Sequence, residues 1–391
     1  MLLYRLIKQA GKTREPGGMT MYRAWAEINT KALENNLALA RRLSGRKVMC
    51  VIKGNAHGHG ALECANVLEK AGADAFGVAC FSEGAALRDA GSRLPILVFG
   101  YTDPALVPQM IEKDLIQSGF EPDYAKALND AAEQCGGVLK IHAKVDTGMS
   151  RTGLSAQDDP KKAADAVTAM AALPHLDVCG IFTHFAAADM PAKDGYTAWQ
   201  LDNFQKVLKT LKDQGFDTDR LLKHAGNSAC ILYHPEVKFD MVRAGVMMYG
   251  FYPNGVWDPD GPLDPVLSLC ARVAQVKEIP AGTSVSYGCT FTSDRPMKIA
   301  AVCAGYADSY PRVLSNKGAW AVINGHKCRQ IGRVCMDMTL FDVTGLDVKQ
   351  GDKAILYGRG GMPLDEVARL TGSINCEATC LITDRVERVY I

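Results

Sequence analysis

The chain is 391 residues long, which is more than the roughly 100–200 residues of one ordinary domain, so the length predicts two domains. Hydrophobic residues make up 48% and charged residues 22% of the chain, a composition that supports a sizeable core and excludes a disordered protein. The 44 lysines and arginines against 43 acidic residues leave a net charge of +1, so charge favours neither nucleic acid nor an anionic membrane as a partner. No apolar run approaches the roughly 20 residues that span a bilayer.

The thirteen cysteines predict a reducing compartment rather than a disulfide framework. Most of them fall in apolar stretches, as do Cys50, Cys80 and Cys303, which is typical of free buried thiols. No CxxC pair occurs, so we expect no zinc site and no metal. These features predict a cytoplasmic protein.

Residues 1–22 differ in sequence pattern from the rest of the chain. The apolar stretch Leu2–Ile7 is too short for the core of a secretory signal, and Gly11–Met19 is polar and rich in glycine and proline. We interpret the segment as a flexible N-terminal extension, or as an upstream start that precedes Met19 or Met21.

The segment 23–252 alternates short apolar runs with amphipathic stretches such as Lys31–Leu43, Ala61–Ala71 and Thr197–Gln214. Asn29 stands where the N-cap of the first helix is expected. The eight strand candidates are Val48–Ile52, Ala75–Ala79, Pro95–Phe99, Leu115–Ser118, Val138–Lys144, Val178–Phe182, Leu221–Lys223 and Met241–Val242. Eight strands alternating with helices predict a (β/α)₈ TIM-like barrel in the α/β class.

The sequence pattern changes again near Phe251. Prolines and glycines cluster over Pro253–Pro265, as in a linker. Short strand-like runs with turn signals follow at Leu269–Glu278, Lys298–Cys303, Trp320–Ile323, Arg329–Met336 and Lys353–Tyr357. The segment 253–391 therefore predicts a C-terminal mainly-β domain.

Cationic and imidazole residues stand at successive strand ends of the predicted barrel. They are Lys53, Lys144 with Arg151, His184, His224 and Arg243. Any one of them alone is as readily a solvated or hydrogen-bonded structural residue. Because the active sites of such barrels lie at the carboxyl ends of the strands, the set together predicts a pocket for an anionic ligand.

Two features point to a phosphate at that pocket. Ser228 opens a short apolar segment where a hydroxyl and backbone amides could bind an anion, and Gly245 with Val246 occupies the loop after Arg243. The last two loops of such barrels often bind phosphate. Gly58-His59-Gly60 fits no nucleotide-binding spacing. A lysine beside a phosphate site suggests pyridoxal phosphate held as a Schiff base.

At this point the motifs resemble those of the pyridoxal-phosphate-dependent alanine racemases, in the same order and over nearly all of Arg23–Ile391. The matching segments are Ala24–Asn29, Val51–Ala56, Lys144–Met149 with Arg151, Thr183–Phe185, His224 with Asn227–Ala229, Val242–Gly245, Met248–Gly250, Val285–Gly288, Ala304–Asp308 and Gly332–Asp337. The resemblance implies a racemase that interconverts L- and D-alanine and supplies D-alanine for peptidoglycan. It also implies a homodimer with shared active sites.

The resemblance further assigns roles. Lys53 carries the cofactor and is one catalytic base, and Tyr287 from the partner's β domain is the other. Cofactor-binding residues are Lys53, His57, Arg151, His184, His224, Asn227, Ser228, Arg243, Gly245 and Val246, with Arg243 at the pyridine nitrogen. Substrate-binding residues are Arg151, Met336, Asp337, Tyr306 and Asp384. In some members the lysine matching Lys144 is carbamylated and braces the arginine.

Two departures from the family pattern affect the site. His57 replaces a tyrosine that touches the phosphate, and an imidazole can donate the same hydrogen bond. Asp384 stands where we expect a tyrosine that closes the substrate pocket. The smaller carboxylate suggests room for serine beside alanine.

Three alternatives stay open. A serine-preferring racemase of the same family is one, and a pyridoxal phosphate barrel decarboxylase is another, although Arg243 stands where decarboxylases place a carboxylate. A non-catalytic cofactor-binding barrel is the third, and such proteins lack the β domain that carries Tyr287 and Met336.

Overall fold

The computed structural model describes residues 22–391, so the predicted extension lies outside the described residues except for Tyr22. The chain divides into two compact units. The barrel unit comprises residues 28–267, 363–382 and 390–391, and the β unit comprises the described residues up to Glu27 with residues 268–362 and 383–389. Within residues 22–391 no helix is both long enough and apolar enough to cross a membrane.

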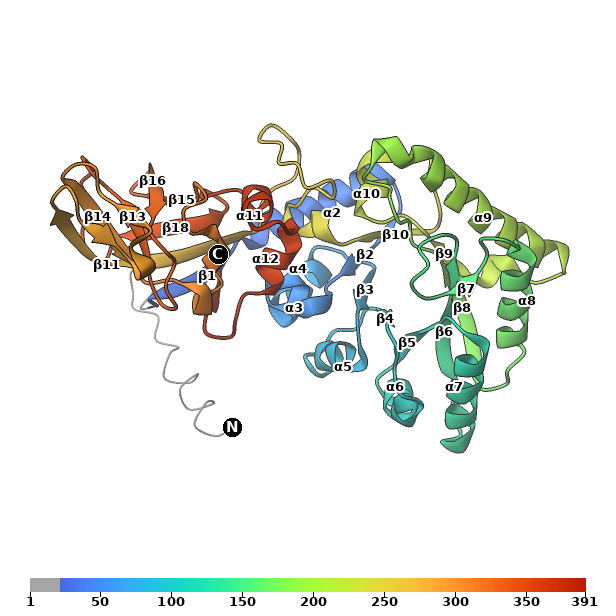
Figure 1. Cartoon of the computed structure of the whole chain (residues 1–391). Helices are drawn as coiled ribbons and strands as arrows, with labels where there is room; N and C mark the ends of the chain where they lie inside the picture. The colour runs from blue at the N-terminus through green and yellow to red at the C-terminus, as the bar shows by residue number, and fades with distance from the viewer. Residues whose placement is uncertain (1–21) are drawn as a thin grey trace. The chain divides into compact units, whose positions relative to one another are not determined.

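The barrel unit is built on a closed ring of parallel strands (Figure 1). Its eight strands are β2 (Lys47–Val51), β3 (Ala75–Val78), β4 (Ile96–Val98), β5 (Leu115–Gly119), β6 (Leu139–Asp146), β8 (Leu176–Phe182), β9 (Leu222–His224) and β10 (Met241–Ala244). The ring closes where β10 pairs in parallel with β2, with Val242 opposite Val48. A two-residue strand, β7 (Leu154–Ser155), pairs with β6 outside the ring. The predicted barrel and its eight strands are confirmed.

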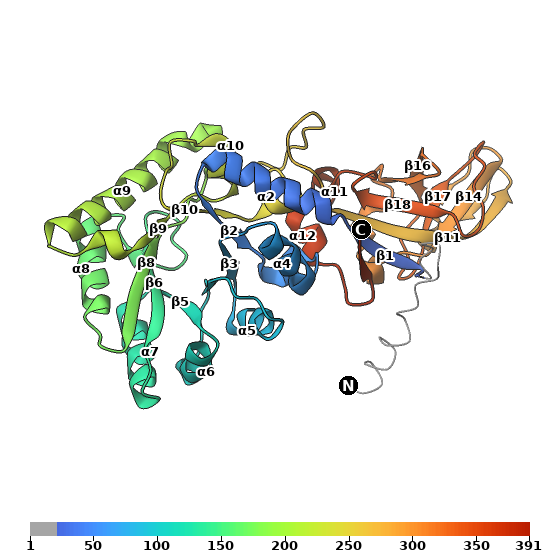
Figure 2. The same cartoon turned by 180° about the vertical axis from the view of Figure 1, so that it is seen from behind.

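Helices surround this ring, as the view from behind shows (Figure 2). They are α2 (Thr30–Ser44), α3 (Lys53–His57), α4 (Ala61–Lys70), α5 (Phe81–Asp89), α6 (Val107–Glu112), α7 (Pro122–Gln134), α8 (Pro160–Ala171), α9 (Asp194–Asp213) and α10 (Ser228–Tyr233). Short 3₁₀ turns add η1 (Pro104–Leu106), η2 (Pro191–Lys193), η3 (Thr218–Arg220) and η4 (Val246–Tyr249). Asn29 caps α2 as predicted, since its Oδ1 accepts the backbone N–H of Ala32 at 2.8 Å.

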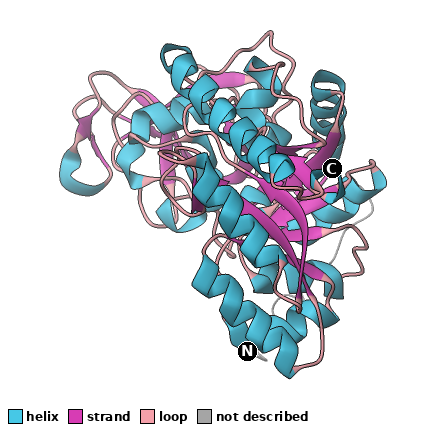
Figure 3. Cartoon of the chain, turned by 90° about the vertical axis from the view of Figure 1, so that its right-hand side faces the viewer, coloured by secondary structure: helices cyan, strands magenta, loops and turns pink. Residues whose placement is uncertain are grey.

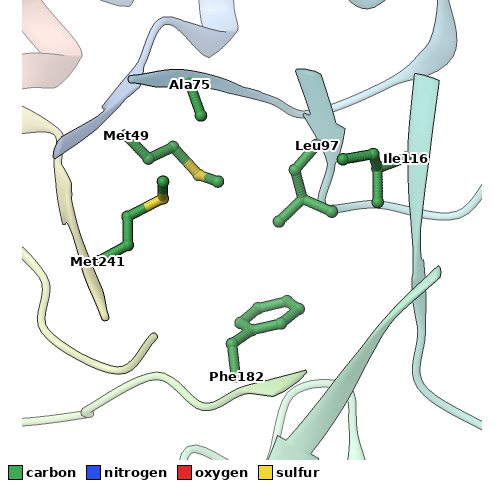
Figure 4. Close-up of a cluster of buried hydrophobic side chains, with 6 residues drawn as sticks. All are labelled: Met49, Ala75, Leu97, Ile116, Phe182 and Met241. Atoms are coloured by element: carbon green, nitrogen blue, oxygen red, sulfur yellow. The ribbon is translucent and has the colours of Figure 1, made fainter. Parts of the chain in front are cut away.

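Apolar side chains from facing strands fill the interior of the barrel (Figure 4). The cluster consists of Met49, Ala75, Leu97, Ile116, Phe182 and Met241. Phe182 also stacks on the imidazole of His224, with ring centroids 4.8 Å apart and planes 6° from parallel. The packed core therefore extends up to the polar residues at the strand ends.

The β unit is an eight-stranded sheet with a small separate hairpin. Figure 3 colours the strands of the chain magenta and its helices cyan. The sheet runs in the order β14 (Met297–Val302), β17 (Thr339–Asp342), β16 (His326–Ile331), β15 (Trp320–Ile323), β18 (Lys353–Gly358), β11 (Leu267–Ile279), β1 (Ala24–Ile28) and β19 (Glu387–Tyr390). The hairpin is β12 (Ser284–Val285) with β13 (Phe291–Thr292), and the 3₁₀ turns are η5 (Tyr287–Cys289), η6 (Tyr306–Asp308) and η7 (Arg312–Leu314). The predicted mainly-β domain is confirmed.

The structure divides the chain differently from the predicted boundaries at residues 253–391. Residues 363–382 return to the barrel unit as α11 (Leu364–Thr371) and α12 (Asn375–Cys380). Asn375 anchors this return, because its Nδ2 donates to the carbonyl of Tyr252 at 3.1 Å. A carbonyl of α12 also lies so close to α3 that a Cβ at Gly58 would stand 1.9 Å from the oxygen of Thr379. The C-terminal part of the sequence therefore contributes to both units.

Candidate active site

A left-handed turn at the end of β2 carries Lys53 and His57. The backbone angle φ is 61° at Gly54, 53° at Asn55, 55° at Ala56 and 51° at His57. Each L-residue in this conformation costs roughly 1–2 kcal/mol, so the surrounding structure has to stabilise the turn. The Asn55 side chain helps to do so by accepting the backbone N–H of Ala61 at 2.8 Å. Such stored strain is typical of functional sites.

A cavity of about 380 Å³ opens at these strand ends within the barrel unit. Nine of the ten predicted cofactor-binding residues line it, namely Lys53, His57, Arg151, His184, Asn227, Ser228, Arg243, Gly245 and Val246. Lys144 and Phe182 line it as well. The tenth predicted residue, His224, lies behind Arg243 and contacts it. The structure thus brings together side chains that the sequence separates by almost 200 residues.

Arg243 is held by a complete set of acceptors on both terminal nitrogens. Its Nη1 donates to Nδ1 and to the carbonyl oxygen of His224, both at 3.0 Å. Its Nη2 donates to the carbonyls of Thr183 at 2.7 Å and Ala225 at 3.0 Å, with Nδ1 of His184 at 3.2 Å. Arg243 as a whole is only 3% exposed, and these bonds fix the plane of its guanidinium.

Several donors at the cavity have no acceptor within residues 22–391. The Nε–H of Arg243 is one, and the amine of Lys53 and the guanidinium of Arg151 likewise have no hydrogen-bond or ion-pair partner there. Arg151 is exposed and Lys53 is half-buried, so these donors are open to the cavity and can bind a ligand that places acceptors opposite them.

A second group of polar atoms lies near the loop after β10. The Oγ of Ser228 accepts the backbone N–H of Gly245 at 2.9 Å, which leaves its hydroxyl hydrogen available. Among the described residues, the N–H of Val246 at the start of η4 has no acceptor, and Nδ1 of the buried His57 has no partner. Hydroxyl, amide and imidazole groups of this kind suit a phosphate.

Burial and positive neighbours lower the pKa values of Lys53, Lys144 and His57 at the cavity. The pKa of Lys53 is lowered by burial and then by the charge of Arg151, while Glu83, Cys376 and Cys380 act in the opposite direction. Burial, with Arg151 and Arg243, lowers the pKa of Lys144 to about 8. Burial and then Lys53 lower the pKa of His57 to about 4, so its imidazole is neutral near pH 7. A neutral lysine amine is the form that attacks a carbonyl or accepts a proton.

The loop that presents Arg151 is organised by one carboxylate. Oδ1 of Asp146 accepts the backbone N–H groups of Gly148, Met149 and Ser150 at 3.0, 2.9 and 3.0 Å. Lys144 on the preceding strand donates to Oγ1 of Thr152 in the same loop. Backbone and side-chain bonds together therefore define the position of this loop.

The predicted residues of the second domain lie in the β unit and do not line this cavity. Tyr287 is 65% exposed, and Tyr306 and Met336 are also exposed. Asp337 accepts a hydrogen bond from Arg385 at 2.5 Å, and Asp384 is exposed.

Sequence reasoning missed the part of the wall that α12 supplies. Ile374, Asn375 and Cys376 line the cavity, as does Asp189 from the loop after β8. No local signal marks these residues, because α12 follows the β unit in sequence and reaches the barrel only through tertiary packing. Cys376 is therefore a wall residue that the sequence analysis did not name.

Together, a closed parallel barrel whose strand ends carry Lys53 and Arg151 without a partner among residues 22–391, followed by a β unit, defines an α/β-barrel enzyme. Residues 28–253 match the family described as "Alanine racemase, N-terminal domain", and residues 266–390 match "Alanine racemase, C-terminal domain". The chain belongs to the alanine racemase family.

Individual relatives agree with this assignment. The chain is 42% identical over 371 residues to an alanine racemase of Desulforamulus reducens, covering 94% of this chain and 98% of the relative. It is 38% identical over 380 residues to an alanine racemase of Methanococcus maripaludis, covering 95% and 100%. Among solved structures, the alanine racemase of Clostridium difficile 630 matches with a TM-score of 0.88 at 34% identity, covering 95% of this chain and 97% of that one.

Proposed function

We propose that the chain interconverts L- and D-alanine with pyridoxal phosphate, using Lys53 and Tyr287 as two opposed bases. The observation that carries this proposal is the convergence of unpaired donors from Lys53, Arg151 and Arg243 on one cavity. The named relatives, described as alanine racemases, support alanine as the substrate. A structure with 32% identity and a TM-score of 0.85, from Bacillus anthracis, is described with bound L-Ala-P.

The polar groups of the cavity fit the cofactor's functional groups. The Nε–H of Arg243 would meet the ring nitrogen, and Ser228, Val246 and His57 would hold the phosphate. A guanidinium stays protonated, so it leaves the ring nitrogen largely unprotonated and limits side reactions that need a strong electron sink. When bound, pyridoxal phosphate supplies acidity at the α-carbon of an amino acid by delocalising negative charge.

Racemisation requires a proton to leave one face of the α-carbon and another to arrive at the opposite face. Lys53 suits one face because burial and Arg151 lower the pKa of its amine. Tyr287 suits the other as a phenol exposed on the β unit. Arg151 would bind the substrate carboxylate, because its guanidinium lines the cavity without a partner within residues 22–391.

We propose a homodimer in which each site combines Lys53 of one copy with Tyr287 of the other. The exposed surface around Tyr287, Tyr306, Met336 and Asp337 would then meet the cavity of the second copy and complete the substrate pocket. The biological role that follows is the supply of D-alanine for peptidoglycan in the cytoplasm.

Three measurements on the purified protein test the activity. We expect conversion of either alanine enantiomer to the racemate, an absorption at about 420 nm from the lysine-bound cofactor, and a borohydride-stable adduct on Lys53. Lys53→Ala should abolish all three. An active protein whose adduct maps to another lysine would refute the assignment of Lys53, and a cofactor-loaded protein inert toward both enantiomers would refute the activity.

Mixing two inactive variants tests the shared site. In a mixed dimer of Lys53→Ala and Tyr287→Phe, one site carries both substitutions and the other carries neither. Random mixing should therefore restore about a quarter of the wild-type activity, since about half of the dimers are mixed and each has one intact site. If Tyr287 serves its own chain, or if the protein works as a monomer, mixing restores nothing.

A further inference from the structure

His142 is a buried imidazole that the proposed reaction does not use. It lies on β6, is 2% exposed, and its Nδ1 is 2.9 Å from Nε2 of His224. Gly180 on the neighbouring strand makes room for it, because a Cβ there would stand 2.5 Å from the imidazole ring. The His142 imidazole therefore fits only because residue 180 has no side chain.

The hydrogen bonds of Arg243 determine which nitrogen of each histidine carries a proton. A guanidinium has only N–H donors, so Nδ1 of His224 accepts from Arg243 and carries no hydrogen as long as Arg243 keeps this position. The neutral ring then carries its hydrogen on Nε2, and that hydrogen points at His142. Nδ1 of His142 must accept it, so the hydrogen of His142 is on Nε2.

Both imidazoles are neutral in this arrangement. A proton added to Nδ1 of His142 would face the N–H of His224, and a proton added to Nδ1 of His224 would face Arg243. Burial, reinforced by the charge of Arg243, also lowers the pKa of His142 to about 4. In this series of hydrogen bonds, Arg243 therefore donates to His224, and His224 donates to His142.

We propose that His142 is a positioning residue that selects the Nε2–H form of His224 and, through it, the orientation of Arg243. Without an acceptor at Nδ1 of His142, the Nε2–H of His224 would lose its partner in a buried place, and the Nδ1–H form would become competitive. That form opposes an N–H of Arg243, so the guanidinium would move and carry its Nε–H with it. The effect on the cofactor rests on the proposed function, whereas the tautomer assignment does not.

Two variants of similar size, His142→Asn and His142→Leu, test the role of the hydrogen-bond acceptor at Nδ1 of His142. Asn and Leu side chains have nearly the same size and leave the same void beside Gly180, but only the Oδ1 of Asn can accept at the place of the Nδ1 of His142. We expect His142→Asn to keep the Nε2–H form of His224 and to stay within about threefold of wild-type kcat/KM. His142→Leu should shift His224 toward the Nδ1–H form and lower kcat/KM by roughly tenfold or more relative to the Asn variant.

The tautomer is read directly from long-range ¹H–¹⁵N correlation spectra of the full-length protein with ¹⁵N-labelled histidine. A wild-type spectrum with the hydrogen of His224 on Nδ1 overturns the proposal, and so does a folded His142→Leu protein that keeps the Nε2–H form. If His142→Leu fails to fold, the wild-type and His142→Asn spectra still decide, because loss of the Nε2–H form in the folded Asn variant also overturns it. A protein with the stated tautomers but no racemisation would contradict the proposed function and leave this assignment intact.

Discussion

The carboxylate of Glu83 accepts the backbone N–H of Gly54 at 2.7 Å, through Oε1. Its Oε2 accepts the backbone N–H of Ala79 at 2.8 Å. One side chain on α5 therefore ties the left-handed turn after β2 to the end of β3. The same carboxylate raises the pKa of Lys53, against the larger effects of burial and Arg151. Glu83 thus links the geometry of the turn to the protonation of its lysine.

Glu83→Ala should loosen the turn and lower the pKa of Lys53 further. We expect a loss of about 1–2 kcal/mol in the free energy of unfolding, since two backbone donors lose a charged acceptor. In protein freed of cofactor, the labelling rate of Lys53 by an amine reagent should reach its half-maximum at a lower pH than in the wild type. Glu83→Gln is the intermediate variant, because it removes the charge and keeps one carbonyl acceptor for the two backbone N–H groups. An unchanged labelling profile in both variants would show that Glu83 does not act on Lys53.

The packing of α12 on α3 predicts a large difference between two glycine substitutions. Gly58 and Gly72 have similar φ angles, 87° and 90°, but a Cβ at Gly58 would lie 1.9 Å from a carbonyl oxygen, whereas Gly72 has nothing within 4 Å. Gly72→Ala should cost about 1 kcal/mol from the backbone alone. Gly58→Ala should cost at least about 2 kcal/mol more, because α12 has to move. Denaturant unfolding measures both, and equal losses would mean that the contact with Thr379 is not maintained in solution.

The depressed pKa of Lys144 predicts a pH-dependent stability. Its amine titrates at about 8 in the folded protein and at about 10.4 when unfolded, so between these values the unfolded chain binds the additional proton. Stability should therefore rise with pH across this window, by about 1–2 kcal/mol after solvent screening. Lys144→Gln should lose that component of the rise. Unfolding curves from pH 7 to 10.5 provide the comparison, and parallel pH profiles would contradict the shift.

Comparing serine with alanine as substrates tests which residue limits the size of the substrate side chain. The sequence suggests that Asp384 leaves room for serine, whereas in the structure Cys376 lines the cavity and Asp384 lies in the β unit. If Cys376 limits the space for the substrate side chain, Cys376→Leu should lower kcat/KM for serine relative to alanine by several-fold. One or two methylenes are worth about 1–3 kcal/mol in a pocket. Asp384→Tyr is the matched test of the sequence-based hypothesis. A change of the ratio only in the Asp384 variant would favour that hypothesis, and a change in neither would end the case for serine.

Much of the site could be predicted because it depends on local sequence and one general rule. Apolar runs bounded by turn residues predict the parallel strands, and the strand ends of a closed barrel meet at one mouth. Lys53, Arg151, His184 and Arg243 therefore had to lie near one another once the eight strands were identified. The cap of α2 by Asn29 is equally local, since it involves residues three positions apart.

Other features could not be read from the chain because they depend on contacts between segments that are far apart in it. The return of α11 and α12 to the barrel unit depends on packing against α3, more than 300 residues earlier. The partnership of His142 with His224 requires two strands to bring their inward side chains together in the interior. The sequence by itself determined the barrel, the β domain and the reactive side chains. Only the tertiary structure decided which of those side chains are left unpaired, because burial and hydrogen-bond partners are properties of the packed chain.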